Sequence, residues 1–220
     1  MITDDLRARI IDCVQGSEEW HAARMGKVTG SRVAAATSDG RSKGAPSATR
    51  EALMAEIICE RRTGKRKDGF KSAAMERGTE LEPEARVNYE FQCDVEVVTV
   101  GLVMHPTITL AGASPDGLVG TDGLVQFKCP EAHTHLAVLE GKPIGGAYIK
   151  QMQWEMACTG RHWCDFVSYC PDWVGCDTQI IRVKRDPAVI VGLERDVRAF
   201  LDEAAARQAA LEAKFGKVAA

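Results

Sequence analysis

The chain has 220 residues, of which 45% are hydrophobic and 27% are charged, and its formal net charge is −3. These values are ordinary for a globular protein and exclude a disordered, collagen-like or coiled-coil chain. No run approaches the ~20 apolar residues of a membrane span, and the first residues lack the apolar stretch of a signal peptide. We therefore expect an intracellular protein without a membrane partner.

Helical patterns come first along the chain. Ser17 is a candidate N-cap for a short helix, a second helix begins near Ser31, and helical periodicity returns over 48–62 and 80–92. Residues 38–47 concentrate Ser, Gly and Pro, which predicts a flexible connection.

Most of the predicted strands lie in the second half. β-Rich runs occur at 95–104, 109–114, 123–129, 163–169 and 177–183. A helix fits 144–158, and a long amphipathic helix runs from about 187 to 214. Helices before and after the strands predict one α/β (α+β) domain over residues 1–220, with a central mixed sheet flanked by helices.

Cysteines and charges are unevenly placed. The eight cysteines form no C-x-x-C pair, so we predict reduced thiols that behave as small apolar side chains. Residues 24–77 carry thirteen Lys or Arg and six Asp or Glu, a balance of +7, so the other 166 residues carry −10. Such a basic segment is typical where phosphates are neutralised, although a solvated helix end with a polar loop would look the same.

The most informative stretch is Ser114-Pro115-Asp116-Gly117, followed by Gln126-Phe127-Lys128. Side chains alternate along a strand, so residues 126 and 128 lie on one face. A carboxylate entering from a turn beside that face can bind a hard divalent cation, and the lysine adds positive charge near an attacked phosphate. The pattern indicates a metal-dependent phosphodiesterase, although SPDG is also an excellent plain turn.

Further motifs occur in a recognisable order: GSEEWHAARMGKVTGS, RGTELEPEAR, SPDGLV, QFKCP and YIKQMQWEM. With this ordered set the chain resembles the lambda-exonuclease-like (YqaJ-type) viral recombinase nucleases of the PD-(D/E)xK superfamily, over roughly residues 15–185. The resemblance implies the restriction-endonuclease-like core of that superfamily.

The resemblance also implies residue roles. Asp116 would be the central metal ligand, Lys128 the catalytic lysine, the Phe127 carbonyl a backbone ligand, and Glu82 a carboxylate from the preceding helix. Gln151 would line the site near metal and water. Arg24, Ser31 and Ser114 resemble the pocket that holds a 5′-terminal phosphate, a task that suits the planar guanidinium.

Several of these residues have plainer interpretations. Glu82 could complete a capping box with Thr79, with Glu80 as the neighbouring candidate, although Pro83 fits that register poorly. Arg24 could pair with Glu18 or Glu19, and Ser31 could simply cap its helix. Gln151 and Gln153 could satisfy backbone groups at a sheet edge. His105 could be a metal ligand, as in some related nucleases, or an ordinary strand exit.

The chain departs from the family pattern at Gln126, where the family has a glutamate. An amide oxygen can still bind Mg²⁺ as a ligand, but it brings no formal charge, so metal affinity and catalysis should fall. Either a natural glutamate is replaced here by glutamine, inactivating the enzyme, or the natural enzyme tolerates the amide. We favour the first explanation because every other matched position is intact.

The resemblance implies a 5′→3′ exonuclease that acts on 5′-phosphorylated ends of double-stranded DNA and leaves 3′ overhangs for recombination. It further implies Mg²⁺ as cofactor, with Mn²⁺ as a substitute and two ions per site. A homotrimer, a single-strand-annealing recombinase as partner, and the cytoplasm of a bacterial or phage-infected cell are implied as well. Two alternatives stay open: a non-catalytic DNA-end-binding protein, and a site-specific endonuclease of the same superfamily.

Overall fold

The computed structural model describes residues 2–40, 46–66 and 73–217. Its helices are α1 (Asp4–Ala8), α2 (Glu18–Arg24), α3 (Gly30–Ala36), α4 (Ala48–Thr63), α5 (Ala73–Cys93), α6 (Ala132–Leu139), α7 (Gly146–Thr159) and α8 (Pro187–Phe215). Its strands are β1 (Ile10–Ile11), β2 (Val97–Val98), β3 (Leu102–Met104), β4 (Gly112–Ala113), β5 (Gly117–Val119), β6 (Gly123–Lys128), β7 (Trp163–Tyr169) and β8 (Thr178–Lys184).

A five-stranded sheet of order β2-β5-β6-β7-β8 forms the centre. The pair β6–β7 is parallel and the other pairs are antiparallel, so the sheet is mixed. A smaller antiparallel sheet of order β1-β3-β4 lies beside it. The prediction of a mixed α/β fold with a central sheet flanked by helices is confirmed.

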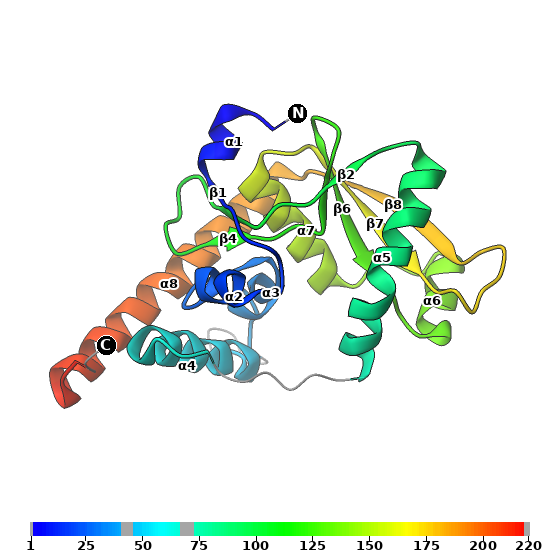
Figure 1. The fold of residues 1–220 in the computed structure, drawn as a ribbon. Coiled ribbons are helices and arrows are strands. Elements are labelled where there is room, and N and C mark those ends of the chain that lie inside the picture. The colour runs from blue at the N-terminus through cyan, green and yellow to red at the C-terminus, as the bar shows by residue number, and fades with distance from the viewer. Residues whose placement is uncertain (1, 41–45, 67–72, 218–220) are drawn as a thin grey trace.

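Each face of the large sheet has its own core. Val125 and Phe127 of β6 pack with Ala85 and Tyr89 of α5 on one face. Leu124 of the same strand belongs to the larger core on the other face, together with residues of α3, α4, α7 and α8. Because side chains alternate along β6, Gln126 and Lys128 lie on the α7 face. Figure 1 shows the long α8 running away from the sheet alongside α4.

Several helix ends follow from local sequence. The Ser17 hydroxyl accepts a hydrogen bond from the Trp20 N–H and caps α2, as predicted. Helix α4 ends at Gly64, whose φ of 62° is readily adopted only by glycine. The Asp186 side chain caps α8, and Pro187 occupies its first turn, where a missing N–H costs nothing.

Some predicted elements differ from the structure. The run 95–104 divides into β2 and β3 around Gly101, where any Cβ would lie 2.3 Å from the Ile11 carbonyl oxygen. Helix α5 begins at Ala73, before the predicted residue 80, and the short elements α1, α6, β1 and β5 were not predicted. Part of the predicted flexible connection, residues 41–45, lies outside the described residues.

All eight cysteines are free thiols; Cys129, Cys158, Cys164 and Cys170 are buried and the other four are partly or fully exposed. Among the residues that the structure describes, no helix is long and apolar enough to cross a membrane.

Candidate metal centre and phosphate pocket

Strands β5 and β6 bring the central motif together. Gly117 pairs with Val125, so Asp116 enters β5 directly opposite Gln126. One carboxylate oxygen of Asp116, Oδ2, accepts hydrogen bonds from Gln126 Nε2 at 2.6 Å and from the Phe127 N–H at 2.7 Å. The predicted juxtaposition of Asp116 with the Gln126-Phe127-Lys128 strand is therefore present.

Asp116 is partly buried. Burial raises the pKa of its carboxyl group, while Lys128 and the hydrogen bonds from Phe127 and Gln126 lower it. The Lys128 ammonium lies 5.3 Å from the centre of the Tyr148 ring. Its charge also lowers the pKa of Asp116, so a positive charge acts on the motif.

Glu82 approaches the site from α5. It lines a hollow of about 620 Å³ together with Phe127, Lys128 and Tyr148, and its side chain remains open to solvent there. Desolvation by the surrounding protein and the charge of Asp116 raise the pKa of Glu82 to about 7. Thr79 lies inside α5 and not at its start, so the capping-box interpretation of Glu82 is wrong.

The two glutamines of α7 have different surroundings. Gln153 donates to the Lys184 carbonyl at 2.8 Å and accepts from the Asp186 N–H at 2.8 Å, so it satisfies backbone at the end of β8. Gln151 instead donates to Glu155 Oε1 at 2.9 Å. The sheet-edge interpretation therefore holds for Gln153 alone.

Glu155 is a site residue that the sequence did not single out. Its side chain is fully buried, with 0% of its surface exposed. Burial and the neighbouring Asp116 raise the pKa of Glu155 to about 8, while Gln151, Lys128 and Arg24 lower it. The available signals were its place one helical turn after Gln151 and its position in the YIKQMQWEM motif.

Arg24, Ser31 and Ser114 meet in a second cluster. The Arg24 guanidinium donates to Ser114 Oγ at 3.2 Å and to Ser31 Oγ at 3.0 Å. It also donates to Thr29 Oγ1 at 3.2 Å and stacks 4.0 Å from the centre of the Trp20 ring, and the sequence predicted neither partner.

The Arg24 cluster lacks a paired carboxylate. In the described residues no ion pair joins Arg24 to Glu18 or Glu19, so that alternative is wrong. Burial and nearby Arg32 lower the pKa of Arg24 to about 10, so it stays charged at neutral pH. Ser31 lies within α3, after the N-cap Thr29, and is not a cap.

The basic segment 24–77 is partly neutralised within the molecule. Arg32 pairs with Glu56 at 2.5 Å and Glu60 at 2.6 Å, and Arg50 pairs with Glu203 at 2.8 Å. His105 lies away from this chemistry: it stacks on Trp154 and is 3.4 Å from Glu194.

The donor set at Asp116 suits a hard divalent cation. Gln126 Oε1 is buried and has no hydrogen-bond partner, which leaves an oxygen available as a ligand. The carboxylates of Asp116 and Glu82, the Gln126 amide oxygen and the Phe127 carbonyl are the groups that could hold it. Among the described residues no three or more His, Cys, Asp or Glu side chains are grouped to hold a metal, so the amide and the carbonyl would have to take part.

Comparison with known proteins identifies the family of this chain. The family model of the YqaJ-like viral recombinase domain matches residues 19–162, more than half of the chain. The chain belongs to this family. Curated protein sequences give no significant match.

Two solved structures of an alkaline exonuclease (LHK-Exo) from Laribacter hongkongensis, one in complex with dAMP, are similar to this chain. Each is 47% identical with a TM-score of 0.84, covering 92% of this chain and 100% of the other. A phage-related exonuclease from Haemophilus somnus is 14% identical, with a TM-score of 0.60 and coverage of 82% and 96%, and shares the fold.

Proposed function

We propose that this protein is a metal-dependent exonuclease that degrades one strand of double-stranded DNA from a 5′-phosphorylated end. The action would run 5′→3′, leave a 3′ overhang for phage-type recombination, and use Mg²⁺, with Mn²⁺ as a substitute and two ions per site. The family and the 47% identity to an alkaline exonuclease support the exonuclease class. A homotrimer and a single-strand-annealing partner belong to the same proposal.

One observation carries the proposal. Ser114 accepts a hydrogen bond from Arg24, and Asp116 follows it by two residues. Two residues of extended chain span at most about 7 Å, so the arginine pocket adjoins the candidate metal centre. A terminal phosphate gripped by Arg24 would then have its neighbouring phosphodiester linkage beside Asp116.

The residues divide the chemistry among them. Arg24, Ser31 and Ser114 bind and orient the terminal phosphate. Asp116, Glu82, the Gln126 amide and the Phe127 carbonyl hold the cation, which when bound polarises the phosphate and lowers the pKa of a water. Lys128 offsets negative charge that develops on the attacked phosphate, and Gln151 orients groups beside it.

Gln126 weakens this arrangement in a specific way. Its amide N–H donates to Asp116 Oδ2 and so occupies a lone pair that a cation would use. A glutamate at 126 could not donate this bond, and two facing carboxylates favour a cation between them. We therefore propose that glutamine at this position inactivates the enzyme.

The Gln126→Glu variant tests the proposal directly. With Mg²⁺ it should degrade end-labelled linear duplex DNA at least about 100-fold faster than the parent chain, the size of effect found for groups that stabilise developing charge. A time course with label at either end reports polarity. Equal activity of the two forms would contradict the inactivating role of Gln126.

The Gln126–Asp116 hydrogen bond also favours a second candidate, a DNA-end-binding protein without catalysis. In that case Gln126→Glu would bind linear duplex but release no nucleotides with Mg²⁺ or Mn²⁺. Closed-circular duplex separates the remaining possibility, because a site-specific endonuclease cuts it and an exonuclease needs an end.

A further inference from the structure

Glu155 lies in the YIKQMQWEM motif without a role assigned to it from the sequence, yet it is the most enclosed acid of the site. It is the only acidic residue of α7 and its side chain is fully buried. Gly30, at the start of α3, leaves room for it: a Cβ on Gly30 would lie 3.2 Å from Glu155 Oε1 and 3.6 Å from Gln151 Cγ.

Two buried oxygens without partners mark the site. Among the described residues, Gln126 Oε1 and Glu155 Oε2 are the only buried side-chain oxygens that lack a hydrogen-bond partner. An orphaned buried oxygen is costly, so its retention points to a positively charged partner.

Other buried acids of this molecule are fully paired. Glu60 accepts from the Gly26 N–H at 2.7 Å and pairs with Arg32. Asp165 accepts from the Tyr89 hydroxyl at 2.9 Å and pairs with Arg182 at 2.8 Å. No ion pair is formed by Glu155 in the described part of the chain, so it differs from the acids that only stabilise the fold.

The surroundings of Glu155 connect it to the candidate metal centre. Its Oε1 holds the Gln151 amide, and the charges of Asp116, Lys128 and Arg24 all act on it. Since the described acids do not form a group of three around one point, Glu155 acts from beyond the direct ligands. Such outer groups orient ligands and tune metal affinity.

We propose that Glu155 is a positioning residue of the metal centre: it orients the Gln151 amide and, in its ionised form with a cation bound, supplies the negative charge that Gln126 does not. The inference rests on the proposed metal-dependent function. It predicts that replacing Glu155 weakens metal binding more when residue 126 is glutamine than when it is glutamate.

The experiment measures Mn²⁺ binding by titration calorimetry on the full chain, without DNA, for four forms: the parent, Glu155→Gln, Gln126→Glu, and the double variant. Glu155→Gln should weaken Mn²⁺ binding about tenfold in the parent, the scale typical of outer-shell groups. The same change in the Gln126→Glu form should cost clearly less. Glu140→Gln, which removes an exposed carboxylate paired only with Lys142, is the matched control and should bind like the parent.

The outcomes distinguish a failure of the role proposed for Glu155 from a failure of the proposed nuclease function. Glu155→Gln binding Mn²⁺ as the parent does, or losing the same factor in both backgrounds, would overturn the role of Glu155 while leaving the nuclease intact. Absence of Mn²⁺ binding and DNA degradation in the Gln126→Glu form would overturn the proposed function itself. If Glu155→Gln does not fold, Glu155→Asp keeps the charge but shortens the side chain that holds the Gln151 amide, and unchanged Mn²⁺ binding by that variant would contradict the positioning role.

Discussion

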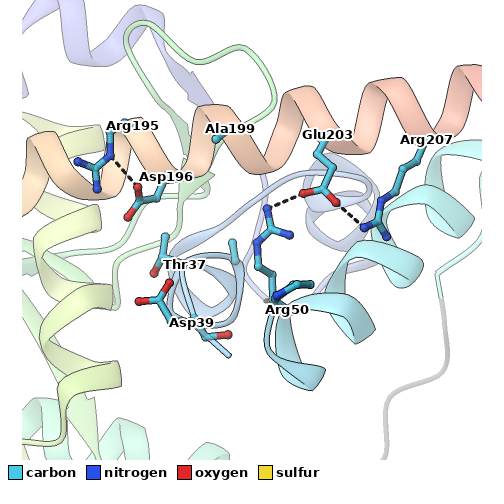
Figure 2. Close-up of a pocket in the computed structure, with 11 residues that line it drawn as sticks. Thr37, Asp39, Arg50, Arg195, Asp196, Ala199, Glu203 and Arg207 are labelled. Carbon is cyan, nitrogen blue, oxygen red and sulfur yellow. Dashed lines mark hydrogen bonds and ion pairs between the residues drawn. The ribbon is translucent and has the colours of Figure 1, made fainter. Parts of the chain in front are cut away.

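Charged side chains gather in a hollow beside α8 and around Asp116, and their pairing differs. A hollow of about 540 Å³ between the end of α3, the start of α4 and α8 is lined by Asp39, Arg50, Arg195, Glu203 and Arg207, among others. Figure 2 shows Glu203 between Arg50 and Arg207, and Arg195 against its neighbour Asp196. We call it the α3–α8 hollow.

The charged groups around Asp116 are paired less completely. Glu155 has no cationic partner at ion-pair distance in the described residues, and one oxygen each of Gln126 and Glu155 is unsatisfied. In the α3–α8 hollow the arginines offset the acids locally. The contrast teaches that the informative feature of a charged site is the group left without a partner, because such a group costs stability unless a ligand completes it.

The largest expected effect is at Lys128. In the Gln126→Glu form, Lys128→Ala should lower the rate of duplex degradation by about 10²–10³, because it removes a positive charge aimed at the attacked phosphate. Lys142→Ala, an exposed lysine paired with Glu140, is the control and should leave the rate unchanged. A similar loss in both variants would mean that general charge, and not the place of Lys128, matters.

Next in size is Arg24. Hydrogen bonds to charged groups contribute ~1.5–3 kcal/mol, so Arg24→Ala in the Gln126→Glu form should slow digestion of 5′-phosphorylated ends by about 10–100-fold. Digestion of 5′-hydroxyl ends should change little. Equal losses on both kinds of end would argue that Arg24 supports the fold and not the phosphate.

A smaller effect concerns pH and stability without divalent cations. The pKa of Glu155 is raised from 4.5 to about 8, so folding favours its neutral form, and the stability due to that form declines as pH rises from about 4.5 to about 8. We expect Tm to fall by several degrees over this range, given ~2–4 °C per kcal/mol for a chain of this size. Glu155→Gln should flatten the curve in thermal melts; parallel curves would show that Glu155 does not titrate there.

The smallest effect belongs to the α3–α8 hollow. Glu203→Gln removes the shared partner of Arg50 and Arg207, and because such partly exposed pairs contribute little, the free energy of unfolding should change by less than about 1 kcal/mol. Mn²⁺ binding should stay as in the parent. A marked loss of Mn²⁺ binding would contradict the distinction drawn between the α3–α8 hollow and the Asp116 site.

Much of the site could be predicted because it depends on local rules. The alternation of strand residues placed Gln126 and Lys128 on one face, and the ordered motifs brought Arg24, Ser31 and Ser114 together although 90 residues separate the first from the last. The long elements α4, α7, α8, β7 and β8 were predicted to within a few residues for the same reason.

Other features depend on tertiary contacts and could not be predicted from the neighbouring residues in the sequence. Short strands such as β1 and β5 exist because neighbours supply their hydrogen bonds, not because of their own propensity. From the sequence, Glu155 was one more polar residue of α7, beside Lys150, Gln151 and Gln153. Only the packing of α3 at Gly30 and the nearness of Asp116 reveal that it is enclosed at the site.

The segment Ser114-Pro115-Asp116 has a consequence for what such an enzyme would release. Pro115 fixes one backbone angle, and its carbonyl accepts a hydrogen bond at 2.9 Å from Gln15, which also binds the Val100 carbonyl. The distance between the bound 5′-terminal phosphate and the cleaved phosphodiester linkage would thus be fixed by these three residues, whose backbone is held in place. Product length would then be a property of the protein, the same for every base sequence that enters.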